Sequence, residues 1–325
     1  MRDHGGNLDQ AIAAYGGEAT DWIDLSTGIN RVPYPIPRLL PGAWTDLPTR
    51  RAMAGLSAAA ARAYATPASV LPVAGAQAAI QMIPRLGPPG SARVLAPTYN
   101  EHAAALRSAG WQVEEVAQAE DLAGADLAVI VNPNNPDGRR IAPDAALALA
   151  GQVGRLVVDE SFADISPELS VAARAGQAGL FVLRSFGKFY GLAGVRLGFL
   201  LGNPDEIAAL AEMAGPWPIS GAAIALGQAA LADAPWAAAT TARLAQEAAS
   251  LDTMAATAGW RCAGGTTLFR LYDTGDAAAA QDRLAHARIW TRRFPYSEGW
   301  LRLGLPGTPA EWARLEEALK GMNAT

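Results

Sequence analysis

The segment Leu183-Arg-Ser-Phe-Gly-Lys-Phe-Tyr-Gly-Leu-Ala-Gly-Val-Arg-Leu-Gly-Phe-Leu-Leu-Gly202 contains one of only two lysines among 325 residues. Two apolar runs, residues 180–183 and 195–201, have the length and composition of buried strands. The small residues between them predict a connection between two strands of one sheet, and Lys188 falls on this connection. Because connections of this kind face a cleft, we expect Lys188 to lie at one.

Lys188 is chemically distinct from the other cations of this chain. Of the 26 basic side chains, 24 are arginines, and only an amine can condense with an aldehyde. A solvated surface group is the usual interpretation of a single lysine. However, Ser185 precedes it by three residues and Arg196 follows it by eight. A hydroxyl donor and a fixed cation in this arrangement favour a phosphate site beside the lysine.

Two polar segments upstream follow apolar runs in the same way. Asp159 ends the run of residues 156–158, and a carboxylate at the end of a buried strand needs a cationic or N–H partner. The nitrogen of a pyridinium ring would be such a partner. The cluster Asn132–Gly138 follows residues 127–131 and predicts a shaped loop of Pro, Asn and Gly. Its side-chain amides can reach a substituent of a ring.

These segments together resemble the fold type I pyridoxal-phosphate enzymes, the aspartate aminotransferase superfamily. Within it the chain is most similar to the branch that contains histidinol-phosphate aminotransferase and the threonine-phosphate decarboxylases of cobalamin biosynthesis. The resemblance extends from His4 to about Leu305 and implies pyridoxal 5'-phosphate as the cofactor. It makes Lys188 the Schiff-base lysine, pairs Asp159 with the pyridine nitrogen, Asn135 with the ring oxygen, and Ser185 and Arg196 with the cofactor phosphate.

Two further cofactor contacts are predicted near the start of the regular region. An apolar stretch, residues 70–74, leads into Gly75, which opens a helical pattern. The N–H groups of a helix start suit a phosphate, although an ordinary helix start fits the pattern equally well. The resemblance assigns Gly75, Ala76 and Gln77 to the cofactor phosphate. It also stacks Tyr99 on the pyridine ring as a catalytic residue beside Lys188 and Asp159, with a core tyrosine as the alternative.

The carboxyl-terminal part of the sequence has three arginines in strand-like segments. Arg302 interrupts the apolar run Trp300–Leu303, and a buried arginine needs an anion. That anion is either an internal Asp or Glu or, by the resemblance, the substrate α-carboxylate. Arg292 and Arg293 suit a second anion and resemble the substrate-phosphate ligands of both enzymes. Two anion sites imply a phosphorylated amino acid as substrate.

The amino-terminal residues are predicted to contribute to the same substrate. His4 stands beside two glycines and can reach an anion with little steric hindrance, although a disordered terminus is the usual interpretation. Asn30, in a turn-rich segment, is placed with the substrate-binding residues. The opening His4-Gly-Gly-Asn7 resembles the decarboxylases more than typical histidinol-phosphate aminotransferases.

The order of apolar runs predicts an α/β fold. Strands alternate with helices over residues 93–159, which indicates a mostly parallel sheet with helices on both faces and ligands beyond the carboxyl ends of its strands. The resemblance gives the fold type I architecture, a large domain plus a smaller α+β C-terminal domain. We expect an N-terminal arm over residues 1–40, a large cofactor-binding domain over 41–220 and a small domain over 221–325. A helix over about 235–258 is expected to bridge the two domains.

Composition excludes several other classes of protein. A net charge of −5 argues against nucleic-acid binding, and no apolar run reaches the roughly 18 residues that a membrane span needs. The polar start lacks a signal-peptide pattern, so we expect a cytoplasmic protein. Its single cysteine, Cys262, excludes an internal disulfide and is expected in the core. The three histidines have no spacing typical of a metal site.

The resemblance implies two activities. One is decarboxylation of L-threonine O-3-phosphate to (R)-1-amino-2-propanol O-phosphate, which the His4 segment favours. The other is amino transfer from histidinol phosphate to 2-oxoglutarate, and Arg302 is compatible with both. A cofactor-binding protein without turnover is a third possibility, against which the complete set of Asp159, Lys188 and Arg196 argues. The relatives are homodimers, so the resemblance also implies a homodimer.

Two departures from the superfamily pattern are visible. Phe162 stands three residues after Asp159, where many aminotransferases have a tyrosine whose hydroxyl meets the cofactor ring oxygen. Asn135 must therefore do more of that work. The segment Ala43–Pro48 lacks the tyrosine that many relatives send into the active site of the partner subunit.

Overall fold

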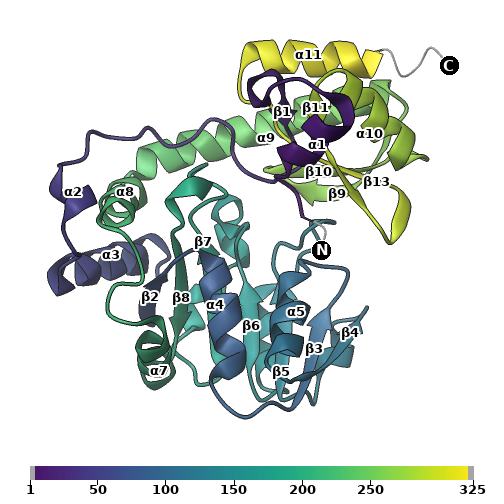
Figure 1. Ribbon diagram of the computed structural model, residues 1–325. Coiled ribbons are helices and arrows are strands. Elements are labelled where there is room, and N and C mark those ends of the chain that lie inside the picture. Colours follow the sequence, from purple (N-terminus) through teal and green to yellow (C-terminus); the bar gives the residue numbers. More distant parts are fainter. Residues whose placement is uncertain (1–3, 321–325) are drawn as a thin grey trace. The chain divides into compact units, whose positions relative to one another are not determined.

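The computed structural model describes residues 4–320, which form two compact units. The larger unit contains residues 34–135 and 139–236. The smaller unit contains residues 4–33, 136–138 and 237–320 of the described chain. The division falls inside α9 (Ala234–Thr257). Figure 1 shows the elements of both units.

A seven-stranded sheet forms the centre of the larger unit, in the order β2-β8-β7-β6-β5-β3-β4. Its strands are β2 (Ser69–Val73), β3 (Ser91–Leu95), β4 (Gln112–Val116), β5 (Leu127–Val131), β6 (Leu156–Asp159), β7 (Leu180–Ser185) and β8 (Gly198–Gly202). Four neighbouring pairs are parallel, and only β8 runs against its two neighbours. The predicted α/β class with a mostly parallel sheet is therefore confirmed.

Helices cover this sheet and bury its apolar runs. They are α2 (Gly42–Thr45), α3 (Arg50–Ala63), α4 (Ala76–Met82), α5 (Glu101–Ser108), α6 (Pro143–Ala150), α7 (Pro204–Ala214) and α8 (Gly221–Ala232), with the 3-10 turns η2 (Ile83–Arg85), η3 (Glu120–Leu122), η4 (Ala163–Ile165), η5 (Pro167–Leu169), η6 (Ala172–Arg174) and η7 (Ala193–Val195). Figure 1 shows α4 and α5 side by side over one face of the sheet. Every residue of β5, β6 and β8 is buried, as expected for strands covered on both faces.

The smaller unit has two sheets. An antiparallel sheet has the order β12-β13-β10-β9, and β1 pairs with β11 in a separate parallel ribbon. Its strands are β1 (Ile23–Asp24), β9 (Arg261–Thr266), β10 (Phe269–Asp273), β11 (Ile289–Trp290), β12 (Arg292–Phe294) and β13 (Ser297–Gly304). Its other elements are α1 (Leu8–Tyr15), η1 (Ala19–Asp21), α10 (Ala277–His286), α11 (Pro309–Lys320) and most of α9. The predicted small α+β domain matches this mixture.

The amino-terminal residues differ from the arm predicted over residues 1–40. Residues 4–33 belong to the smaller unit, and Ile23 pairs in register with Ile289. Trp22 is only 6% exposed, and its ring meets that of Trp290 edge to face at 6.3 Å. These apolar contacts join two segments far apart in the sequence, which no local pattern could reveal. The boundary predicted between residues 220 and 221 also differs, because it lies inside the larger unit.

Three strand predictions need correction. The sequence predicts one strand over residues 266–271, whereas Thr266 ends β9, residues 267 and 268 form a hairpin turn, and β10 begins at Phe269. The strand expected over residues 289–293 is divided, since β11 pairs with β1 whereas β12 pairs with β13. The strand expected from residue 195 begins only at Gly198 because Arg196 has a left-handed backbone with φ +53°.

Two properties of the described chain bear on its surroundings. Cys262 is exposed with a free thiol, so its predicted place in the core is wrong. It lies on β9, an edge strand of the small sheet. None of the helices within residues 4–320 combines the length and the apolarity needed to cross a membrane.

The packing of Trp22 predicts a difference between two tryptophans. Replacing Trp22 by alanine leaves a cavity beside Trp290 and should lower the free energy of unfolding by about 3–5 kcal/mol. Trp217 is 54% exposed, so Trp217→Ala should change stability by less than about 0.5 kcal/mol. Calorimetric melting of both variants measures the difference. Equal melting temperatures would contradict the assignment of residues 4–33 to the smaller unit.

Candidate active site

The polar residues predicted for the cofactor gather at one edge of the large sheet. β5, β6 and β7 are parallel neighbours, so their carboxyl ends meet at the same edge. Val131 pairs with Asp159, and Asp159 pairs with Leu183. The structure therefore brings together Asp159 and Ser185, the last residues of β6 and β7, and the end of β5, which Asn132 follows. The alternation of elements predicts this arrangement.

Asp159 is a buried carboxylate whose two oxygens both have partners. Its side chain is 4% exposed, and Oδ2 lies 2.8 Å from Nε2 of His102. Oδ1 accepts hydrogen bonds from the backbone N–H of Ser161 at 2.9 Å and from its hydroxyl at 2.5 Å. Burial alone would raise the pKa of Asp159, but the contacts with His102 and Ser161 outweigh it and hold the pKa below its usual value. Asp159 therefore stays ionised and can pair with a protonated ring nitrogen.

His102 is a site residue that the sequence analysis missed. It is 3% exposed on the first turn of α5, and its ring lies edge-on to Tyr99 with centroids 6.2 Å apart. The helix begins soon after β3 ends, at the same edge of the sheet as Asp159. A histidine at the start of a helix that follows a strand could have indicated a site residue. Its contact with Asp159 could not be predicted, because the two residues are 57 positions apart in the sequence.

A second buried ionic group lies next to Asp159 in the sequence. Glu160 is 0% exposed and lies 2.8 Å from Nη1 of Arg184, whose Nη2 lies 2.8 Å from Asp164. The guanidinium also lies 4.3 Å from the centre of the Tyr64 ring. Successive residues of a strand point to opposite faces, so Glu160 and Arg184 lie behind Asp159 and Ser185. This ion pair joins β6 and β7 just where the predicted cofactor residues begin.

Lys188 lies in the turn that follows β7. Its side chain is half-buried, with Nζ 5.6 Å from the centre of the Phe162 ring. Phe162 thus offers a ring face, where a tyrosine would offer a hydroxyl. The turn is held by two stacked ring pairs, Phe186 on Tyr190 at 4.5 Å and Tyr190 on Trp236 at 5.6 Å. Because β8 is the antiparallel neighbour of β7, the predicted position of Lys188 between two strands of one sheet is confirmed.

The residues predicted for the cofactor phosphate form a cradle. A Cβ atom on Gly75 would lie 2.7 Å from a guanidinium nitrogen of Arg196, and one on Gly198 would lie 2.4 Å from the backbone nitrogen of Ala76. Only glycine permits these approaches. Ser185 pairs with Gly198 in the β7–β8 ladder, so its hydroxyl belongs to the same region.

Two kinds of donor are available in this cradle. The N–H groups in the first turn of α4 have no acceptor within the helix, as at any helix start. Arg196 is exposed, and among residues 4–320 no carboxylate forms an ion pair with it. Its Nη1 donates to the carbonyl of Ala193 at 3.1 Å, which leaves further N–H groups for an anion.

Tyr99 and the asparagine loop border the same edge. The hydroxyl of Tyr99 donates to Gln77 at 3.3 Å, and Gln77 in turn donates to Glu101 at 3.0 Å. In the loop, Asn132 is bonded to Ile141 through both side-chain atoms, and Asn134 is bonded to the carbonyl of Pro97 and the hydroxyl of Thr98. Two of the three asparagines thus shape the loop. The role of Asn135, which is buried at 9% exposure, stays a prediction.

This set of residues fits pyridoxal 5'-phosphate. It offers a buried ionised carboxylate for the ring nitrogen, an amine at the adjacent strand end, and a cradle of glycines and one arginine for the phosphate. All of these groups come from the larger unit.

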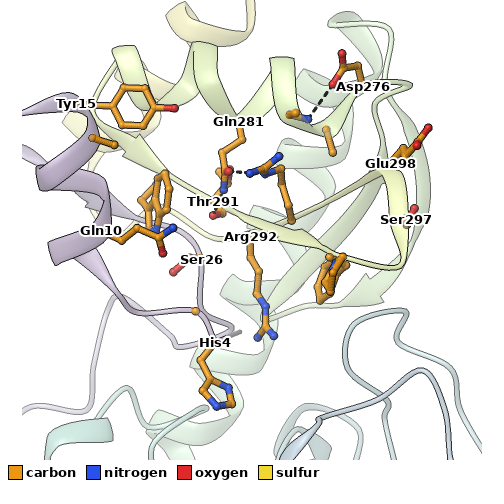
Figure 2. Close-up of a pocket in the computed structure, with 18 of the residues that line it drawn as sticks. His4, Gln10, Tyr15, Ser26, Asp276, Gln281, Thr291, Arg292, Ser297 and Glu298 are labelled. Atoms are coloured by element: carbon orange, nitrogen blue, oxygen red, sulfur yellow. Dashed lines mark hydrogen bonds between the residues drawn. The ribbon is translucent and has the colours of Figure 1, made fainter. Parts of the chain in front are cut away.

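The predicted substrate arginines lie in the smaller unit, where Figure 2 shows a cavity of about 770 Å³. Arg292 pairs directly with Arg302 across β12 and β13, so the two side chains share one face of the sheet. Arg302 is 2% exposed, lies 5.2 Å from the centre of the Phe269 ring, and donates to the carbonyl of Ser26 at 2.5 Å. In Figure 2 the side chain of Arg292 points toward His4, which lines the cavity.

Arg293 does not join Arg292. As the next residue of the strand it faces the other way, toward α10, where its Nε donates to Gln281 at 2.7 Å. The sequence analysis grouped both arginines on one anion because it did not use the alternation of the strand. All three of His4, Arg292 and Arg293 line the same cavity, although the two arginines extend to different sides of β12, and their assignment to one anion stays a prediction.

Asn30 has a structural contact of its own. It is 2% exposed, and its side-chain oxygen accepts hydrogen bonds from Arg243 at 2.9 Å and from the backbone of Val32 at 3.1 Å. These bonds stabilise the turn that follows β1. Its predicted contact with substrate stays a prediction.

Comparison with known proteins identifies similar sequences and a similar fold. The sequence model described as "Aminotransferase class I and II" matches residues 21–319. Threonine-phosphate decarboxylases from Sinorhizobium sp and Pseudomonas aeruginosa are each 44% identical, over 98% and 99% of this chain and 98% of each relative. A histidinol-phosphate aminotransferase from Pectobacterium atrosepticum is 32% identical over 48% of either chain. The histidinol-phosphate aminotransferase of Sinorhizobium meliloti, solved in complex with pyridoxal-5'-phosphate, superposes with a TM-score of 0.81 at 21% identity, over 97% of this chain and 93% of that one.

The contact between Asp159 and His102 predicts a pH effect. The folded-state pKa of Asp159 lies below the value of about 3.9 for an unfolded chain, so its ionised form stabilises the fold above about pH 4. That contribution is lost as the pH falls through the folded-state pKa. In His102→Phe, burial should raise the pKa of Asp159 and remove the contribution.

Carbon-13 NMR of the Asp159 carboxyl group measures this pKa, and melting temperatures between pH 3 and 6 measure the stability. His286→Phe is the matched control, because His286 is exposed on α10 of the other unit. An unchanged pKa of Asp159 in His102→Phe would show that other groups hold the carboxylate ionised.

Proposed function

Because the chain belongs to the aminotransferase class I and II family, we propose that it is a pyridoxal-phosphate-dependent enzyme that decarboxylates L-threonine O-3-phosphate. The products are (R)-1-amino-2-propanol O-phosphate and carbon dioxide, in the biosynthesis of cobalamin. The observation that carries this proposal is the 44% identity, over nearly the whole chain, with two proteins named threonine-phosphate decarboxylase.

The smaller unit supports a substrate with two anions. Arg292 and Arg302 share one face of the sheet, and both guanidinium groups present planar forks that suit carboxylates and phosphates. We assign the α-carboxylate to Arg302 and the phosphate to Arg292, with His4 beside it. Arg302 is buried, and a guanidinium inside the small unit suits the planar carboxylate of an amino acid.

The larger unit supplies the residues that would hold the cofactor. When bound, pyridoxal 5'-phosphate provides the electron sink for cleavage of a bond at the substrate Cα. The ionised carboxylate of Asp159 would hold a proton on the ring nitrogen, and Ser185, Arg196 and the first turn of α4 would anchor the phosphate. Tyr99 would stack on the ring, and Asn135 would donate to its oxygen.

Lys188 has the role that requires an amine. Its Nζ would carry the cofactor aldehyde carbon before substrate binds and would then return a proton to Cα after carbon dioxide leaves. The Phe162 ring lies beside this amine, with Nζ 5.6 Å from the ring centre.

The test is carbon dioxide release from L-threonine O-3-phosphate by the cofactor-loaded protein, with no keto acid present. We expect release by the wild type and a loss of about 10²–10⁴-fold or more in Lys188→Ala. Lys320→Ala is the matched control, because Lys320 is the only other lysine and forms an exposed pair with Glu316 at 2.6 Å. Its activity should equal that of the wild type.

The opposite result would assign the chain to the other activity. If no carbon dioxide appears, and amino transfer from histidinol phosphate to 2-oxoglutarate does, the protein is an aminotransferase. That result would leave the assignment of the cofactor residues intact, since both reactions use the same cofactor.

We also propose a homodimer in the cytoplasm. One short segment of the larger unit exposes four large apolar side chains at 65–79% of their surface, namely Ile36, Leu40, Trp44 and Leu47. Apolar groups of this size on one segment are typical of a protein interface. Light scattering measures the assembly, and a monomer at micromolar concentration would contradict the proposal.

A further inference from the structure

The side chains of the two neighbouring arginines of β12 point to different faces of the small sheet. β12 is an edge strand, and Arg292 shares a face with Arg302. Arg293 faces α10, and the structure gives it no place beside Arg302. Since the proposed substrate has two anions and Arg302 and Arg292 account for both, Arg293 is available for another ligand.

Arg293 is held in position by a buried glutamine. Gln281, on α10, is 7% exposed and accepts the hydrogen bond from Nε of Arg293 at 2.7 Å. The amide of Gln281 is itself fixed, because it donates to the carbonyl of Thr291 at 2.7 Å. Among residues 4–320 no carboxylate forms an ion pair with Arg293, which is exposed. Its two terminal nitrogens are therefore preoriented donors.

Thr291 adds an independent sign of a ligand. It lies between β11 and β12, two residues before Arg293, and both residues line the cavity of Figure 2. Thr291 is 1% exposed, and its hydroxyl oxygen has no hydrogen-bond partner among the described residues. Buried hydroxyls without a partner are uncommon, and a ligand oxygen would supply one.

The remaining walls favour a small anion. Tyr15, on α1, lines the same cavity and donates to Asp282 at 2.9 Å. Burial and that bond raise the pKa of Tyr15, whereas the positive charge of Arg293 opposes the rise. Asp276 and Glu298 also line the cavity and would repel any anion, a small one of low charge the least.

We propose that Arg293, Gln281 and Thr291 form a second oxyanion site for phosphate or a small phosphate monoester, on the opposite face of β12 from Arg292 and Arg302. Arg293 and the hydroxyl of Thr291 are the donors, and Gln281 is the positioning residue. The assignment of Arg293 to a separate site rests on the proposed function, which gives Arg292 and Arg302 to the substrate, but binding of phosphate there requires no reaction.

The experiment measures how phosphate raises the melting temperature of the protein loaded with pyridoxal 5'-phosphate, so that the cofactor site is filled. Independent sites contribute additively to such stabilisation. We expect the phosphate-dependent rise in melting temperature to be reduced in Arg292→Gln, which retains the Arg293 site, and in Arg293→Gln, which retains the Arg292 site. The double variant should lose the rise. Thr291→Val, which removes only the hydroxyl, should reduce the rise that remains in Arg292→Gln.

Two controls separate the site from general charge effects. In the first, chloride keeps the ionic strength equal between samples. In the second, Arg314→Gln removes an exposed arginine of the same unit that does not line this cavity and that donates to the carbonyl of Asp21. Methyl phosphate replaces phosphate in a second series. A rise in melting temperature that depends on Arg293 with either ligand establishes the site, and the ligand that gives it shows whether the site takes free phosphate or a phosphate monoester. The proposal is overturned if Arg293→Gln keeps the full rise, or if Arg292→Gln alone abolishes it.

Discussion

The ion pair between Glu160 and Arg184 joins β6 and β7 where both strands end. Both side chains are at most 5% exposed, and buried charges persist only with close partners, which Asp164 and the Ser170 hydroxyl complete. Since side chains alternate along a strand, fixing these two on one face also fixes Asp159 and Ser185 on the other. The positions of Asp159 and Ser185 at the carboxyl edge of the sheet therefore depend on an ion pair on the opposite face.

The same alternation organises the smaller unit. The register that pairs Arg292 with Arg302 places two guanidinium groups on one face and turns Arg293 to the other. Residues 4–33 complete this unit through Trp22 and the β1–β11 ribbon, and they bring His4 to the cavity that Arg292 lines. The N-terminal segment, which its prolines and glycines predict to be an arm, is thus part of the smaller unit through residue 33.

Local patterns predicted most of the elements, because apolar runs and helix signals are local properties. The positions of Asp159 and Lys188 at one edge of the sheet were predictable, because Asp159 ends an apolar run and Lys188 falls between two such runs. The partner of Asp159 was not, since His102 lies 57 residues away and only the packing of α5 brings it close. The hairpin of β9 and β10 was missed because Gly264 and Gly265 weaken the strand pattern of β9. The face of Arg293 followed from register, which the sequence alone does not fix.

The central claim is that the amine at the end of β7 holds the cofactor. Borohydride reduction of the protein loaded with pyridoxal 5'-phosphate fixes the cofactor covalently to the amine that carries it, and peptide mapping by mass spectrometry then locates it. The structure predicts the label on the peptide that contains Lys188, with none on the peptide that contains Lys320. A label on Lys320, or no label at all, would contradict the account.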